Sequence, residues 1–275
     1  MDPVVALTRL GGIASARDLL ALTTRKRLRR AVEKRDITHV ARNRYALRSA
    51  DEAIAVAMDV DGHLRLLSAA AHWGWKVKWP ARFPQILVTE KPEHPVKAEI
   101  TCGVAPCQGW STTPLQTVLD CAAELPFDEA LAVADSALRH GNVTRDELDV
   151  VRSADPAVQR VLEHASKRAA NPFESVLRAI LIEAGIAVVP QWATTVGGIT
   201  YTPDLADPFR GIAIEANSWA HHAGKTEHND DCLRYNALVV GGWIVLRFTW
   251  EQVMFEPHTV VATVRAVIEL RAAAA

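Results

Sequence analysis

The sequence has no hydrophobic run long enough to cross a membrane. Every apolar stretch in its 275 residues is shorter than the roughly 18 residues that a membrane-spanning helix needs. The opening residues, MDPVVALTRLGG, also lack the charged segment and long apolar core of a secretory signal. We therefore expect a cytoplasmic protein that does not associate with a membrane.

Cysteine is scarce, and the four residues Cys102, Cys107, Cys121 and Cys232 form no CxxC pair. A structural zinc site or a thioredoxin-like redox motif would need closely spaced pairs. Scattered, reduced thiols are the expected state of cysteine in the cytoplasm. The cysteines therefore indicate neither a metal site nor a disulfide framework.

A strong charge of either sign is also absent. The formal net charge is −1 at pH 7, from 31 Lys and Arg against 32 Asp and Glu. This balance excludes a uniformly basic coat, although it can hide a local basic patch. The hydrophobic fraction of 49% is typical of a globular chain, and the length suits two or three small domains.

What is present begins with a regular order of elements over residues 1–55. A short apolar-periodic helix comes first, and Ser15 is placed to cap a second helix. Thr23 or Thr24 caps a third helix, and residues 37–47 then alternate as a small hairpin. Helix, helix, basic helix and hairpin is the order of a winged helix-turn-helix DNA-binding domain.

The third helix is strongly basic, and two more arginines stand at the turn of the hairpin. A recognition helix lies in the major groove, where positive side chains neutralise phosphates. A solvated helix face is the alternative explanation for such a charge run. The order of elements favours DNA binding, through the residues Arg25, Lys26, Arg27, Arg29, Arg30, Arg42 and Arg44.

The strings GGIASARDLLAL and RLRRAVEKRDITHVARNRYAL give this segment a recognisable pattern. They resemble the N-terminal winged helix of the AbiEi-type antitoxin and regulator family. The resemblance implies a sensor helix, a basic helix and a wing that ends in Tyr-Ala-Leu. It adds a regulatory or toxin–antitoxin role to the functions that must be considered.

The middle region, residues 56–165, shows helices and strands but no catalytic constellation. GHLRLLSAAAHWGW predicts a helix, and PQILVTEK and VKAEITC predict strands. Trp73, Trp75 and Trp79 could stack on bases, although burial in a core is the more common role of such a cluster. The region is similar to the second, mixed α+β region of AbiEi-type proteins, which implies a scaffold that contacts a protein partner or a second copy of the chain.

Residues 166–275 change to the pattern of an α/β domain. An amphipathic helix opens with Asn171 as its cap and Pro172 at its first position. Several strands follow, then a helix that ends at Gly241 and Gly242, a buried strand WIVLRF and a closing helix. This order suits a small mixed sheet with helices on both faces.

Three acids in this last region have the placement of a metal site. Asp204 stands at a strand start after Pro203, and Glu215 lies inside the next apolar strand, IAIEAN. A hairpin brings both side chains to one face, and a buried carboxylate is costly unless it is paired or metal-bound. Glu174 on the preceding helix is either a capping-region acid or a third ligand. Phosphodiester hydrolysis by a metal needs such hard oxygen ligands.

Five strings occur in order between residues 168 and 270: NPFESVLRAILIEAGI, PQ, YTPDLADP, IAIEANSWAHH and DDCLRYNALVVGGWIVLRFTWEQV. Together they resemble the DUF559 family, a relative of the very-short-patch-repair (Vsr-like) endonucleases in the PD-(D/E)xK nuclease superfamily. The resemblance implies a restriction-endonuclease-like fold, Mg²⁺ or Mn²⁺ as cofactor and DNA as substrate. It places family positions at Glu174, Asp204, Glu215, His221, Asp231, Arg234 and Arg247.

Two positions depart from the family pattern. Asn217 stands where the superfamily usually has lysine, and Ser218 where a glycine usually follows. Asparagine cannot act as a general base, although it can position a water molecule. His221 or His222 could replace the missing base or acid, and a solvated loop pair is the alternative. Adjacent histidines are not spaced for tetrahedral zinc, which favours Mg²⁺ or Mn²⁺.

Two functions remain open from the sequence. One is a metal-dependent DNA endonuclease or nickase, and the other is a DNA-binding regulator or repressor whose nuclease-like domain is inactive. The enzyme would bind its metal through Asp204 and Glu215, and its expected catalytic residues are Asp204, Glu215, His221, Glu174 and Asn217. Asp207 is expected only to form the turn before Pro208.

Overall fold

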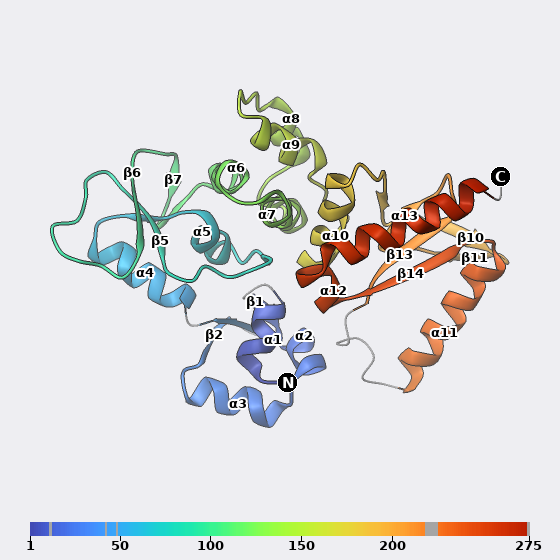
Figure 1. The fold of residues 1–275 in the computed structure, drawn as a ribbon. Helices are drawn as coiled ribbons and strands as arrows, with labels where there is room; N and C mark the ends of the chain where they lie inside the picture. The colour runs from blue at the N-terminus through green and yellow to red at the C-terminus, as the bar shows by residue number, and fades with distance from the viewer. Residues whose placement is uncertain (11–12, 42, 48, 218–224, 274–275) are drawn as a thin grey trace. The chain divides into compact units, whose positions relative to one another are not determined.

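A computed structural model describes the chain except residues 11–12, 42, 48, 218–224 and 274–275. The chain forms two compact units, Met1–Lys167 and Arg168–Ala275 (Figure 1). Each unit mixes helices with small sheets, which confirms the expected α/β class at this level. In the parts that the structure describes, no helix is both long and apolar enough to cross a membrane.

The first unit opens with helices and strands in the order expected from the sequence, with one additional strand. Its elements are α1 (Pro3–Arg9), β1 (Ile13–Ser15), α2 (Ala16–Leu22), α3 (Arg25–Glu33), β2 (Ile37–Ala41) and β3 (Arg44–Leu47). Ser15 Oγ accepts the N–H of Asp18, and Thr24 Oγ1 accepts the N–H of Arg27, so α2 and α3 start at side-chain caps. The additional strand β1 pairs with β3 to form the sheet β1-β3-β2.

A small core joins these elements. Leu7 and Leu19 are fully buried, and α3 contributes Leu28 and Ala31 from one face. The apolar stripe expected on the third helix is therefore confirmed. Because that stripe faces the core, the basic side chains between its members point outward.

The rest of the first unit contains a five-stranded sheet and a group of helices. Its elements are α4 (Ser49–Asp59), β4 (His63–Leu64), α5 (Leu66–His72), β5 (Gln85–Val88), β6 (Glu99–Cys102), β7 (Cys107–Gln108), β8 (Ser111–Thr112), α6 (Pro114–Glu124), α7 (Phe127–His140), α8 (Arg145–Val150) and α9 (Pro156–His164). The strand order is β6-β5-β4-β8-β7. A helix over the whole of GHLRLLSAAAHWGW was wrong at its start, because His63 and Leu64 pair with β5 instead.

Helix α4 crosses the expected boundary between residues 55 and 56. Its buried residues Ala53 and Ala57 pack in one cluster with Leu64 and Ile86 of the five-stranded sheet. The helix is therefore part of the core of that sheet.

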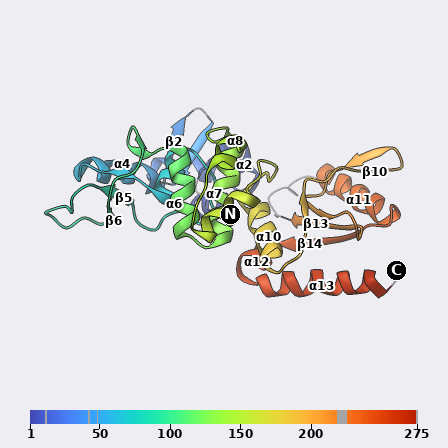
Figure 2. The same cartoon turned by 90° about the horizontal axis from the view of Figure 1, so that it is seen from above.

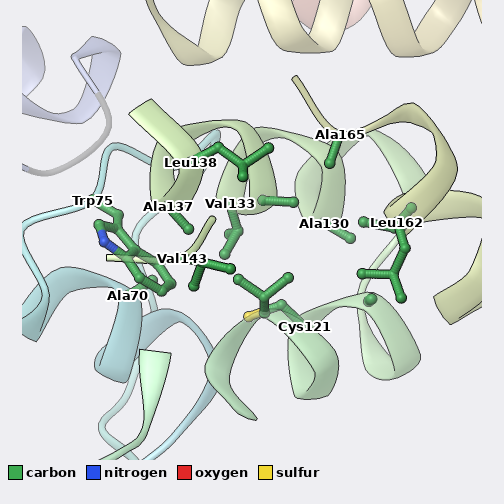
Figure 3. Close-up of a cluster of buried hydrophobic side chains, with 14 of the residues drawn as sticks. Ala70, Trp75, Cys121, Ala130, Val133, Ala137, Leu138, Val143, Leu162 and Ala165 are labelled. Atoms are coloured by element: carbon green, nitrogen blue, oxygen red, sulfur yellow. The ribbon is translucent and has the colours of Figure 1, made fainter. Parts of the chain in front are cut away.

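Two tryptophans of the middle region, Trp73 and Trp75, pack in its core. Trp75 is fully buried at one end of the cluster in Figure 3, and its Nε1 donates to Asn142 Oδ1 at 2.8 Å. Trp73 Nε1 donates to the carbonyl oxygen of Thr112 at 3.1 Å. Base stacking is thereby excluded for Trp75, since its ring is not accessible. Cys121 lies in the same cluster, and all four cysteines are free thiols.

The second unit is built on the mixed sheet β14-β13-β12-β9, in which β13 and β14 are parallel and the other pairs antiparallel. Its elements are α10 (Pro172–Glu183), β9 (Val189–Pro190), β10 (Thr194–Val196), β11 (Ile199–Tyr201), β12 (Leu205–Asp207), β13 (Ile212–Asn217), α11 (Lys225–Val240), β14 (Ile244–Thr249), α12 (Trp250–Phe255) and α13 (Pro257–Ala273). Asn171 caps α10, and Pro172 is its first residue, as expected.

Helices cover both faces of this sheet. Ile212 and Ile214 of β13 pack into a core that includes Leu177 of α10 and Val260 of α13. Successive side chains of a strand point to opposite faces, so Glu215 faces away from that core. Figures 1 and 2 show α11 and α13 on opposite sides of the sheet. One face of β13 therefore holds the unit together, and the other face is free to carry polar groups.

Candidate metal and DNA site

Asp204 and Glu215 are adjacent at one end of the hairpin formed by β12 and β13. Leu205 pairs with Ile214 in the strand register, so the preceding residue, Asp204, falls opposite Glu215. Asp204 Oδ2 accepts the N–H of Ala216 at 2.9 Å, and the two carboxyl groups are hydrogen-bonded to each other. The structure thus brings together the two acids that the sequence proposed as metal ligands.

Glu215 is buried and Asp204 is half-buried, and this shielding from water determines their protonation. The pKa of Glu215 is raised to about 8, first by burial and then by the neighbouring charge of Asp204, while Arg234 opposes the rise. Burial also raises the pKa of Asp204, against a hydrogen bond from Ala216. The pair therefore shares a proton at neutral pH, which Glu215 donates to Asp204.

A positive charge from α11 lies against the acid pair. An Nη2 of Arg234 donates to Glu215 Oε1 and approaches the carbonyl oxygen of Thr202 at 3.4 Å. The Arg247 guanidinium lies over the ring of Tyr235, 4.3 Å from its centre. Burial raises the pKa of Tyr235, and so does the charge of Glu215. Three family positions of the sequence analysis, Glu215, Arg234 and Arg247, thus lie in one neighbourhood.

Glu174 reaches this neighbourhood while it also caps its own helix. Its Oε1 accepts a hydrogen bond from Asn171 Nδ2, and its Oε2 one from the N–H of Ala170, both at 2.8 Å. Gln191 Nε2 then lies 3.3 Å from Glu174 Oε2 and 3.4 Å from Asp204 Oδ1. Glu174 therefore takes part in the cap of its helix and is linked to Asp204 through Gln191, and its role as a third ligand stays a prediction.

Gln191 is a residue of the site that the sequence analysis did not identify. It lies in the left-handed backbone region with φ 51°, and its N–H donates to the carbonyl oxygen of Asp204 at 2.9 Å. A glutamine between two short strands gives no signal of such a backbone conformation. Its only trace in the sequence was the Pro-Gln dipeptide in the string that resembles the nuclease family.

The remaining predicted catalytic residues have different outcomes. Asn217 ends β13 and pairs with Thr249, on the same face of the strand as Glu215. Ser218, His221 and His222 lie outside the described residues. Asp207 closes the turn as expected: it is buried, and its carboxylate accepts the Arg210 N–H at 3.1 Å and contacts Arg210 Nη1 at 2.7 Å.

The carboxyl pair has the chemistry that Mg²⁺ or Mn²⁺ prefers. Mg²⁺ is commonly held by one or two carboxylates and completes its shell with waters. Asp204 and Glu215 offer such oxygens, and a divalent ion would replace both the shared proton and the charge of Arg234. Within the described part of the chain, no three Asp, Glu, His or Cys side chains converge closely enough to hold a metal ion. The fit is therefore to a two-carboxylate site.

The predicted DNA-contacting residues of α3 form an outward basic face. Arg25, Lys26, Arg27, Arg29 and Arg30 are all exposed. Arg29 makes an exposed ion pair with Glu33 at 3.5 Å, and Arg27 donates to the carbonyl oxygen of Met1. Arg44 begins β3, whereas Arg42 lies outside the described residues.

Comparison with known proteins gives distant relatives. Two uncharacterized proteins of Mycobacterium tuberculosis, Rv2248 of strain H37Rv and MT2308 of strain CDC 1551, are each 29% identical over 163 residues. The match covers 56% of this chain and 60% of each relative, so it spans less than two thirds of their length. No protein-family profile matches the chain, and no solved structure does.

Proposed function

We propose that the chain is a divalent-metal-dependent DNA endonuclease or nickase, directed to DNA by the basic face of α3. One observation carries the proposal: two hydrogen-bonded carboxyl groups lie side by side, the buried Glu215 on β13 and the half-buried Asp204 immediately before β12. Burial of two acids in contact is unfavourable unless a cation or a proton compensates for it. A functional metal site gives a reason for keeping them.

The proposal gives each residue of the candidate site a role. When bound, Mg²⁺ activates a water molecule and stabilises the leaving oxygen. Asp204 and Glu215 would hold it, and the Ala216 N–H and Gln191 fix the orientation of Asp204. Asn217, on the same strand face, would orient the attacking water. His221 is the remaining candidate for the proton transfer.

Plasmid nicking tests the proposal directly. The purified chain is incubated with supercoiled plasmid and Mg²⁺ or Mn²⁺, beside Asp204→Asn and Glu215→Gln. We expect nicking by the wild type and a loss of at least about 100-fold in both variants, because each removes a metal ligand. Glu269→Gln on the exposed side of α13 removes the same charge elsewhere and should nick as the wild type does. Nicking that survives both site variants would contradict the proposal.

The second candidate function is a DNA-binding regulator with an inactive nuclease-like unit. It is favoured by Asn217 in place of the usual lysine and by the guanidinium of Arg234 against Glu215. A regulator would bind a specific DNA sequence tightly and nick no plasmid under either metal. That combination of results would replace the enzyme with the regulator.

A further inference from the structure

The carboxyl pair of Asp204 and Glu215 has a positively charged side chain of the same chain, Arg234, as its ion-pair partner. Arg234 extends from α11 to Glu215 Oε1, and its side chain is 29% exposed while that of Glu215 is 5% exposed. The guanidinium therefore lies at the rim of the site, with one end on the buried acid and one edge toward solvent. The carbonyl oxygen of Thr202 is its second anchor.

A guanidinium and a divalent metal cannot share this position. Arginine stays protonated under all ordinary conditions, so Arg234 cannot be neutralised and can only move away. Two cations beside one carboxylate repel each other, and the repulsion is strong where water is partly excluded. The oxygen that Arg234 contacts, Oε1 of Glu215, is also one that a metal would need.

The surroundings give Arg234 a second position. Its guanidinium carbon lies 5.6 Å from the centre of the Tyr235 ring, which the Arg247 guanidinium also contacts, at 4.3 Å. A phosphate that reached the exposed part of this side chain would accept the guanidinium through two parallel hydrogen bonds. Arg234 can therefore leave Glu215 without becoming an isolated charge.

We propose that Arg234 is an internal counter-cation that competes with the divalent metal for Glu215 and so sets the metal affinity of the site. This inference rests on the proposed function, because it takes Glu215 as a metal ligand. It makes Arg234 a residue that regulates metal loading rather than a catalytic residue. Loss of Arg234 should strengthen metal binding, whereas loss of a residue that merely orients Glu215 would weaken it.

Calorimetric titration of the full chain with Mn²⁺ alone and Mg²⁺ alone tests this without any DNA. We expect Arg234→Met to bind the metal about tenfold more tightly than the wild type, because the competing charge is gone. Arg210→Met is the matched control. It removes the same charge from the turn between β12 and β13 and also leaves a buried carboxylate, Asp207, without its ion pair. Its metal affinity should equal that of the wild type.

The outcomes separate the inference from the proposed function. Equal or weaker binding by Arg234→Met, with metal bound by the wild type, overturns the inference and leaves the nuclease proposal standing. An equal rise in Arg210→Met also overturns it, since the effect would then be one of net charge. If neither the wild type nor Arg234→Met binds either metal, the metal site itself is refuted. Near-ultraviolet circular dichroism shows whether each variant is folded.

A measurement on the wild type decides the question if Arg234→Met does not fold. The guanidinium resonance of Arg234, assigned by its loss in Arg234→Lys, reports on the ion pair with Glu215. Saturating Mg²⁺ should shift this resonance and speed its exchange with solvent as the ion pair opens. A resonance that stays unchanged at saturation would show that metal and Arg234 do not compete.

Discussion

At the scale of single residues, the position of Glu215 beside Asp204 makes its ionisation in the folded chain unfavourable. A carboxyl group that is buried beside another acid is held in its neutral form, and ionising it inside the fold is unfavourable. Arg234 reduces this free-energy cost, because its charge opposes the rise in the pKa of Glu215. The site is therefore stable without metal only through a proton and a cation of its own.

The raised pKa of Glu215 predicts that the stability of the folded chain depends on pH. The pKa of Glu215 is about 8 in the folded chain against its ordinary value of 4.5, so the folded state binds the proton more tightly. The resulting stability is fully present below pH 4.5 and is lost as the pH rises through 8. Glu215→Gln cannot ionise, so without metal it should lose this slope and melt about 3 °C above the wild type at pH 8.

Thermal melts of the metal-free chain between pH 5 and about 8.5 measure this difference. Glu269→Gln removes an exposed carboxylate and should keep the slope of the wild type. Equal slopes in Glu215→Gln and the wild type would show that Glu215 ionises as freely in the fold as in the unfolded chain.

At the scale of elements, local signals predicted the fold better than signals that depend on pairing. Helix starts were predicted correctly where the sequence places a capping residue directly before the helix, as at Ser15 and Asn171. The short strands β1, β4, β7 and β8 gave no signal, because two or three residues become a strand only through the partners beside them. The approach of Asp204 to Glu215 followed from strand alternation, whereas the contact of Arg234 with Glu215 depends on how α11 packs.

Gln191 links two elements of the site, and its removal should separate them. Gln191→Ala removes the amide between Glu174 and Asp204, and we expect about tenfold slower nicking with weaker Mn²⁺ binding. Gln191→Gly removes the same amide but relaxes the left-handed backbone, so it should be about 1 kcal/mol more stable than Gln191→Ala.

Nicking rates and urea denaturation of the two variants measure the two effects separately. Equal activity loss with different stability would assign the loss to the amide. If Gln191→Gly recovers the activity of the wild type, the role of this position is only to shape the backbone.

At the scale of the whole molecule, the chain has almost no net charge, but basic and acidic side chains are concentrated in different regions. The net charge is close to zero, yet α3 presents a face of basic side chains. The acid pair lies in the second unit, and the basic face lies in the first. DNA binding by α3 and a partner for the middle region stay predictions, as does the role of His221.

The basic face predicts how DNA affinity responds to salt. Replacing Arg27, Arg29 and Arg30 together by Gln should weaken DNA binding by the full chain and lower the salt slope by up to about 3, since each phosphate contact contributes about 0.9. The ion pair of Arg29 with Glu33 is exposed, so its loss should cost little stability.

Fluorescence anisotropy with a labelled duplex between about 50 and 200 mM salt measures this slope. Lys91→Gln removes an exposed charge on the loop after β5 and should leave the slope almost unchanged. An unchanged slope in the triple variant would remove α3 from the DNA contact.

The two faces of strand β13 have different surroundings. Ile212 and Ile214 face the core, whereas Glu215 and Asn217 lie on the face of the candidate site. A slip of one residue would bury the acid in the core and put isoleucine in its place. The position of Glu215 is therefore fixed by the packing of the core, because a strand in the wrong register could not form the core of the second unit. Substitutions on the polar side of β13 can therefore change the candidate site while the core stays intact, whereas a shift in strand register would disrupt the core as well.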